Sequence, residues 1–192
     1  VNTMATSSDG RAFYIDASSV GRLSGEAISL WRERVTSDPL TGAFYRQMGL
    51  TLLDGSDNRF EWQPHPGARI DGTVPFVEQP QQDRTDYIFN ANDSPWLTNV
   101  AAPLTGYSPL YGPEETARSL RTRMNAKLLT DTSPGGPTGE DDKFSLQELQ
   151  QALLSNRSLT ADLLLDELLG ACAKSPAVLV DKQRVDLSSA CT

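Results

Sequence analysis

The sequence predicts an α+β fold in which a β-hairpin and a short strand come first and helices occupy the C-terminal half. Three observations predict it: an Asp-Gly dipeptide between two strand-like runs, a β-rich run that ends in a polar cluster, and helix caps late in the chain. The 192 residues suffice for one domain with a core, or for a domain with an arm. We expect one segment, 1–192, without internal repeats.

Residues 1–18 give the clearest local signal. Two runs of strand-like residues, 1–8 and 11–18, flank Asp9 and Gly10. An Asp-Gly pair between such runs is typical of a hairpin with a type I′ turn, because both central positions of that turn need positive φ. We therefore predict a β-hairpin over 1–18.

The next part, 20–85, is predicted to be an irregular excursion, because Gly, Pro, Asp and Ser recur and periodicities are short. Residues 27–31 fit a brief strand or a helical turn. Residues 62–67 must be loop, since prolines interrupt them. Residues 86–89 (Asp-Tyr-Ile-Phe) are predicted to form a buried strand, so that 86–99 comprises a strand followed by a polar cluster.

The part from 114 to 192 is predicted to be mainly helical. A first helix is expected over 114–129, where Leu120, Met124 and Leu128 recur at four-residue spacing and Glu114 can pair with Arg118. After a linker over 130–142, the capping-box sequence 145–148 predicts a helix to about residue 155. A last helix is expected from Ser158 or Thr160 to 170–174.

Composition excludes several classes of partner. The net charge of −8 argues against nucleic acid, which requires a basic surface. No apolar run approaches the roughly 20 residues of a membrane span, so we expect no membrane partner. The sequence starts with Val1, without an initiator Met or a signal-peptide pattern, and we treat both of its ends as cut points.

The two cysteines, Cys172 and Cys191, fit either a disulfide or a pair of buried thiols. We expect the disulfide, which would close a loop of about 20 residues and contribute about 3 kcal/mol by chain-entropy reasoning. A disulfide favours an oxidising compartment. No CxxC pattern or Cys/His cluster indicates a metal site.

Few residues are candidates for chemistry. His65 is the only histidine, and its place between two prolines predicts a loop residue without a zinc or triad role. Asn92 can aim its amide at a developing oxyanion, or it can serve only a turn. One of Arg118, Arg121 and Arg123 can hold a carboxylate or carbonyl through its fork, or all three can form a solvated face. Spacing does not choose among them.

The block at 87–99, Tyr-Ile-Phe-Asn-Ala-Asn-Asp-Ser-Pro-Trp-Leu-Thr-Asn, resembles the penicillin acylase (penicillin amidase) family. It is most similar to the acyl-homoserine-lactone and aculeacin-type acylases of that family. The resemblance continues through 103–110, and upstream through 1–5, 10–16 and 54–62. It covers nearly the whole chain in order, but only the block at 87–99 is specific.

The resemblance implies an N-terminal-nucleophile hydrolase with an αββα sandwich. In that family a precursor cleaves itself, and the Ser exposed at the start of the larger (β) subunit attacks an amide carbonyl. The α-amine of this Ser is the base, which is chemically reasonable because it titrates near 8. The family's Ser precedes the position of Val1, so the chain is expected to be an internal piece of the β subunit that is inactive alone.

Two site residues follow from the resemblance. Asn92 matches the family's oxyanion-hole asparagine, the second Asn of an N-x-N motif, and Arg121 matches an arginine that helps hold the site together. The alignment needs one inserted residue before Arg121, which leaves Arg118 and Arg123 as alternatives. Pro103 stands where calcium-binding relatives have an aspartate, so we expect no metal or other cofactor in this segment.

The resemblance therefore predicts a portion of a secreted or periplasmic hydrolase that deacylates small N-acylated molecules. Penicillins, lactone signals and lipopeptides are not separated by this sequence. The expected partners are the small subunit and the Ser-bearing start of the large subunit. The alternatives are a non-catalytic scaffold or binding domain that shares the fold, and a self-contained secreted domain.

Overall fold

The computed structural model describes residues 1–139, 141, 143–189 and 191, and the chain forms two compact units. The N-terminal unit is Val1–Arg118 and the C-terminal unit is Ser119–Thr192. Helices occur with two small antiparallel sheets, which confirms the α+β class.

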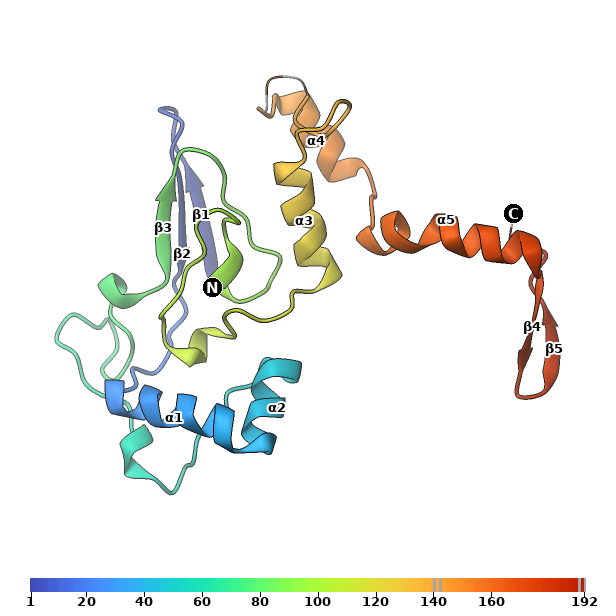
Figure 1. The fold of residues 1–192 in the computed structure, drawn as a ribbon. Helices are drawn as coiled ribbons and strands as arrows, with labels where there is room; N and C mark the ends of the chain where they lie inside the picture. The colour runs from blue at the N-terminus through green and yellow to red at the C-terminus, as the bar shows by residue number, and fades with distance from the viewer. Residues whose placement is uncertain (140, 142, 190, 192) are drawn as a thin grey trace. The chain divides into compact units, whose positions relative to one another are not determined.

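A three-stranded antiparallel sheet, in the order β1-β2-β3, organises the N-terminal unit (Figure 1). Strands β1 (Asn2–Thr6) and β2 (Ala12–Asp16) form the predicted hairpin, and β3 (Gln81–Arg84) pairs with the other edge of β2. The turn is not type I′, because Gly10 has a φ of 83° whereas Asp9 is not left-handed. Instead, Ser7 and Arg11 close a three-residue loop with Gly10 in the left-handed position.

Two helices lie within 20–85, so the prediction of an irregular excursion was wrong there. Helix α1 (Gly25–Ser37) buries Ala27, Trp31 and Val35, which recur every four residues and form one core stripe. Helix α2 (Pro39–Met48) follows directly. Pro39 at the first position of α2 is compatible with helix, because the missing N–H has no intrahelical partner there, and the Asp38 carboxylate caps the next amides.

The predicted strand over 86–89 is absent, and the strand forms earlier, as β3 (Gln81–Arg84). Segment 86–89 runs beside Thr98 with one backbone hydrogen bond, from Phe89 N to Thr98 O at 2.9 Å. Its other support comes from the fully buried Asn99, whose amide donates to the carboxylate of Asp86 and to the carbonyl oxygen of Tyr87. A side-chain amide thus replaces a neighbouring strand.

In the C-terminal unit, the first helix is shorter than predicted. Helix α3 (Leu120–Thr130) begins after Ser119, whose hydroxyl accepts from Thr122 N at 3.2 Å. Residues 114–118 are not helical, and the predicted pair of Glu114 and Arg118 does not form. Glu114 accepts instead from the amides of Gly106 and Tyr107.

The remaining helices confirm their predicted starts. Helix α4 (Leu146–Leu154) begins at the capping box of Ser145 and Glu148, and α5 (Leu159–Lys174) follows Ser158. The predicted linker over 130–142 begins with the last residue of α3, Thr130, and continues as irregular chain and turns in its described part; Glu140 and Asp142 lie outside the described residues.

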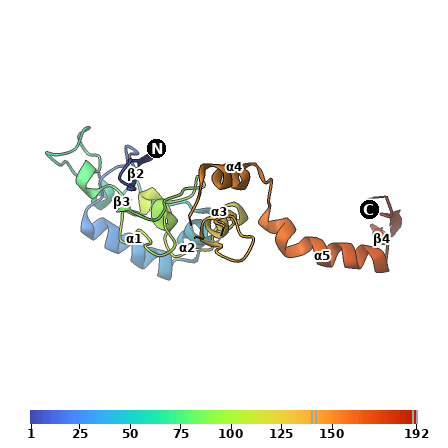
Figure 2. The ribbon, with the colours of Figure 1, turned by 90° about the horizontal axis from the view of Figure 1, so that it is seen from above.

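After α5 the chain forms a second hairpin, β4 (Ala177–Val180) and β5 (Gln183–Asp186), which the sequence did not predict (Figures 1 and 2). Its turn residues Asp181 and Lys182 have positive φ of 50° and 66°, as a type I′ turn requires. The disulfide between Cys172 and Cys191 is confirmed and ties the end of α5 to the chain beyond this hairpin. Within the described part of the chain, no helix is both long and apolar enough to cross a membrane.

Candidate functional site

The N-x-N motif forms a tight turn in the N-terminal unit. The Asn90 carboxamide spans this turn, because its Oδ1 accepts from Asp93 N at 3.2 Å and its Nδ2 donates to Asp93 O at 3.1 Å. Asn92 lies between them with a φ of 56° and an exposed side chain. Left-handed backbone is unfavourable for residues with a Cβ, and asparagine tolerates it best. The turn is therefore held closed by the first Asn and presents the second.

Arg118 braces the far side of the same turn. Its guanidinium donates through Nη1 to Asp93 Oδ1 at 2.7 Å and to Ser94 Oγ at 3.0 Å. The side chain is only 5% exposed, and its guanidinium carbon lies 4.9 Å from the ring centroid of Trp96. Such a planar, stacked, multidentate contact suits arginine and cannot be reproduced by lysine.

A second set of contacts anchors Arg118 to the chain that precedes α3. Its Nε donates to Thr116 O at 3.0 Å, its Nη2 donates to Thr116 Oγ1, and Nη2 lies 3.4 Å from Pro113 O. The Ser94 hydroxyl also donates to Pro113 O, at 2.6 Å. The loop at 113–118 and the turn at 90–94 are therefore joined through one buried cation.

The three candidate arginines differ in environment. Arg118 precedes α3, belongs to the N-terminal unit and contacts the Asn92 turn. Arg121 and Arg123 lie on α3 in the C-terminal unit, with exposed side chains. The assignment of Arg121 to the site remains a prediction, whereas Arg118 makes contacts that the sequence offered only as an alternative.

The hairpin supports the turn from the side of the sheet. Tyr14, at the centre of β2 and fully buried, donates its hydroxyl hydrogen to Asn2 Oδ1. Asn2 Nδ2 in turn donates to Asn90 Oδ1 at 3.2 Å. Burial raises the pKa of Tyr14 well above its usual value, and the charge of Asp16 acts in the same direction. The phenol therefore stays protonated and remains a donor at neutral pH.

These supporting residues were not predicted from the sequence. Tyr14 and Asn2 lie in the hairpin, about 80 residues from the motif, and no spacing rule connects them with Asn90. The signal for Arg118 was available in Ser119, a residue type that favours the N-cap position, because a helix that starts after Ser119 leaves Arg118 outside it.

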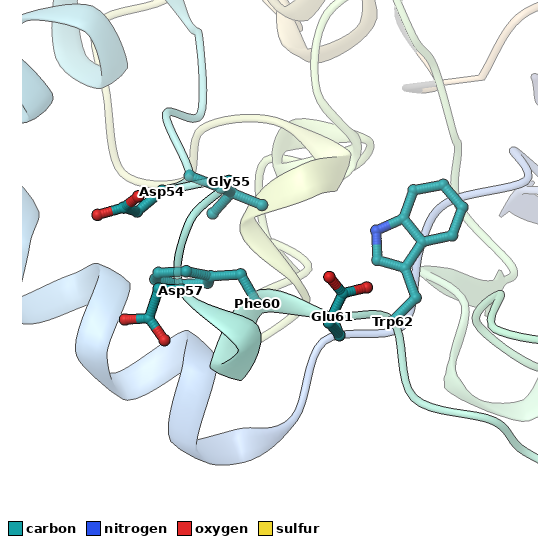
Figure 3. Close-up of a pocket in the computed structure, with 7 residues that line it drawn as sticks. Asp54, Gly55, Asp57, Phe60, Glu61 and Trp62 are labelled. Atoms are coloured by element: carbon teal, nitrogen blue, oxygen red, sulfur yellow. The ribbon is translucent and has the colours of Figure 1, made fainter.

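A separate cavity of about 320 Å³ lies along 53–62 in the N-terminal unit (Figure 3). Asp54 and Asp57 lie at one end of it, and the indole of Trp62 lies at the other. Asp57 pairs with Arg59 at 2.6 Å, and this arginine lowers the pKa of Asp57 to about 2. Asn92 is not among the residues that line this cavity.

The single histidine and the acidic residues are also candidates for a second site in the described part of the chain. His65 is a loop residue, as predicted, and its Nδ1 accepts from Gly67 N at 3.0 Å. Among the residues whose positions are described, no group of three or more His, Cys, Asp or Glu side chains could hold a metal ion.

Comparison with known proteins shows which family this chain is similar to. The family model for penicillin amidase matches residues 1–190. The chain is 34% identical to aculeacin-A acylase of Actinoplanes utahensis over 193 residues, which is all of this chain and 24% of that protein. It is 34% identical over 173 residues to the acyl-homoserine lactone acylase PvdQ of Pseudomonas syringae pv. tomato, which is 90% of this chain and 20% of that acylase. The chain thus spans a quarter or less of the length of these relatives.

Proposed function

We propose, because this chain belongs to the penicillin amidase family, that the protein carrying it is an amide-bond hydrolase that deacylates small N-acylated molecules. The names of the relatives favour acyl-homoserine lactones or an aculeacin-type substrate. The proposal includes the αββα sandwich of N-terminal-nucleophile hydrolases, with this chain supplying one part of it.

In this proposal Asn92 stabilises the negative charge that forms when the nucleophile attacks the amide carbonyl. The nucleophile is a Ser that has no counterpart among residues 1–192 and is supplied by the remainder of the enzyme. The Asn92 amide donates a hydrogen bond that strengthens as the carbonyl oxygen becomes an oxyanion. An oxyanion donor of this kind accelerates a reaction by about 10²- to 10³-fold.

One observation carries the assignment: Asn92 is held in a left-handed conformation at the exposed apex of a turn whose neighbours are braced from both sides. A turn that only reversed the chain would not need such support. Backbone strain that persists because its surroundings fix it is common at active sites, where it pre-organises a group. Arg118 supports Asn92 by fixing Asp93 and Ser94.

The disulfide between Cys172 and Cys191 supports a place of action outside the reducing cytosol. We therefore propose a secreted or periplasmic enzyme. Its partners in this proposal are the small subunit and the Ser-bearing start of the large subunit.

The test is the kcat of Asn92 variants in the full-length enzyme, measured on a panel of N-acyl homoserine lactones of stepped chain length and on penicillin. Asn92→Ala should lower kcat by 10²-fold or more. Because Ala also incurs the cost of positive φ, Asn92→Gly should give the same loss with a relaxed backbone.

A matched control is Asn156→Ala, because Asn156 is also exposed and left-handed, with a φ of 54°. It should leave kcat within about twofold of wild type, since it carries only the backbone cost. A change below threefold in both Asn92 variants would remove the oxyanion assignment. A full-length protein without activity on the whole panel would instead favour the scaffold alternative.

A further inference from the structure

We propose that the Tyr14 hydroxyl is a positioning group for the catalytic amide, acting through Asn2 and Asn90 on the turn that carries Asn92. This inference rests on the proposed function, because it assigns a role in the same reaction. It concerns residues of the β1–β2 hairpin, which lie outside the N-x-N motif at Asn90 and Asn92.

The pairing of β1 with β2 places the first two members together. Tyr14 lies opposite Met4 in the antiparallel pair, and Asn2 is two residues from Met4, so Asn2 and Tyr14 share one face as diagonal neighbours. At this spacing a tyrosine can reach the asparagine, and the Tyr14 hydroxyl does donate to Asn2 Oδ1. The contact fixes which end of the Asn2 carboxamide is the acceptor.

That orientation decides what Asn2 can do next. With its oxygen occupied by Tyr14, Asn2 turns its Nδ2 to Asn90 Oδ1, at 3.2 Å. The same Asn90 oxygen accepts from Asp93 N at 3.2 Å, across the apex at Asn92. One oxygen thus receives both the contact from the sheet and the hydrogen bond that closes the turn.

Tyr14 is suited to this role because it cannot move. Its side chain is fully buried in the central strand of the sheet, whereas Asn2 lies on an edge strand and is only partly buried. A hydroxyl fixed by the core holds Asn2, and Asn2 holds the Asn90 carboxamide in the rotamer that closes the turn. Without the hydroxyl, the Asn90 carboxamide keeps its contacts within the turn but loses its restraint from the sheet, and the Asn92 apex loses part of its pre-organisation.

The test is Tyr14→Phe in the full-length enzyme, which removes one hydroxyl and keeps the ring in the core. It should lower kcat three- to tenfold, the usual effect of losing one supporting hydrogen bond, and leave KM within twofold. Tyr111→Phe is the matched control, because Tyr111 is also buried and its hydroxyl has no hydrogen-bond partner among the described residues. It should leave kcat unchanged.

A double mutant separates positioning from general stability. In an Asn92→Gly background, Tyr14→Phe should have less than a twofold further effect on kcat, because the group that it positions is gone. A merely structural role would give the same fold-loss in both backgrounds and would overturn the inference. Asn2→Ala provides a second route to the same break at a partly exposed position, and it should reproduce the loss caused by Tyr14→Phe.

The outcomes distinguish this inference from the proposed function. If Asn92→Gly is severely impaired while Tyr14→Phe and Asn2→Ala retain wild-type kcat, the positioning role is wrong and the oxyanion assignment stands. If Asn92→Gly itself retains wild-type kcat, both are overturned.

Discussion

Replacing Arg118 tests the bracing of the Asn92 turn, because this side chain makes most of the contacts that join 90–94 to 113–118. Arg118→Ala removes the ion pair with Asp93 and the stacking on Trp96. A hydrogen bond to a charged group contributes about 1.5–3 kcal/mol, and a partly desolvated cation–π contact about 1 kcal/mol. Asp93 is still 24% exposed, so water compensates in part. We expect a loss of about 3 kcal/mol in the local stability of the turn.

The assay is hydrogen exchange of the full-length enzyme at the amides of Asp93 and Ser94, both of which donate hydrogen bonds within the turn. A loss of about 3 kcal/mol corresponds to about a hundredfold faster exchange through local opening. Arg118→Lys should fall between the wild type and Arg118→Ala, because Lys keeps the charge but loses the fork and the stacking. Arg123→Ala, an exposed arginine of α3, is the control and should change protection by less than threefold.

A double-mutant cycle with Asp93→Asn should show a coupling of about 1–2 kcal/mol between Arg118 and Asp93. Under the proposed function, the catalytic rate should fall along with the protection, because a mobile turn would no longer hold Asn92 in place. Wild-type protection in Arg118→Ala, or a coupling near zero, would refute the reasoning. In that case the ion pair between Arg118 and Asp93 would stabilise the turn no more than hydration of the Asp93 carboxylate does.

Two other sets of substitutions should change the free energy of unfolding in directions that follow from the structure. Gly42→Ala should destabilise the protein by about 1–3 kcal/mol, because the new Cβ would lie 2.7 Å from the Val35 carbonyl oxygen. In contrast, the new Cβ of Gly170→Ala in α5 meets nothing within 4 Å, and this substitution should stabilise the helix by about 0.5–1 kcal/mol. Thermal unfolding midpoints that shift in the same direction in both variants would contradict this. Asp86 has a pKa held well below its usual range, first by its bond to Arg84, so its stabilising effect is present above about pH 4 and is lost as the pH falls further. Because the Asp86 side chain is 39% exposed, Asp86→Asn should cost at most about 1 kcal/mol at pH 6, and the unfolding curves of the two proteins should converge toward pH 2; a constant gap would refute the linkage.

The elements that could be predicted from sequence are those in which one local signal dominates. The hairpin over 1–18 and the capping box at Ser145 were found because turn and cap residues act over a few positions. The helices within 20–85 were missed because recurring Gly, Pro, Asp and Ser were taken to exclude regular structure, although Pro39 at the first position of α2 is compatible with helix. The four-residue spacing of Ala27, Trp31 and Val35 indicates a helix, but residues 27–31 alone fit a brief strand or a helical turn equally well.

The displaced strand has a different cause. Segment 86–89 is the more apolar run, yet the polar run Gln81–Arg84 pairs with β2. Strand pairing depends on which backbone groups face a partner, and that is a tertiary property. The β4–β5 hairpin was missed for a related reason, because Asp181 and Lys182 are a rarer choice for a left-handed turn than the Asp-Gly pair.

The candidate site was only partly accessible from the sequence. Asn92 could be singled out only through the resemblance of its N-x-N motif to that of the family, because its spacing fits a simple turn equally well. Its supports could not, because Tyr14, Asn2 and Arg118 reach it through tertiary contacts across separations of 24 to 88 residues. The different environments of Arg118 and Arg121 depend on where α3 begins, and the boundary of a helix is hard to place from sequence alone.

The most direct measurement of the central claim is a crystal structure of the full-length enzyme with a tetrahedral boronate adduct on its nucleophile, which mimics the oxyanion intermediate. Asn92 Nδ2 should lie about 2.7–3.1 Å from the adduct oxygen in the oxyanion position, with the Asn92 backbone still left-handed. An Asn92 amide that lies beyond hydrogen-bonding distance of every adduct oxygen would contradict it.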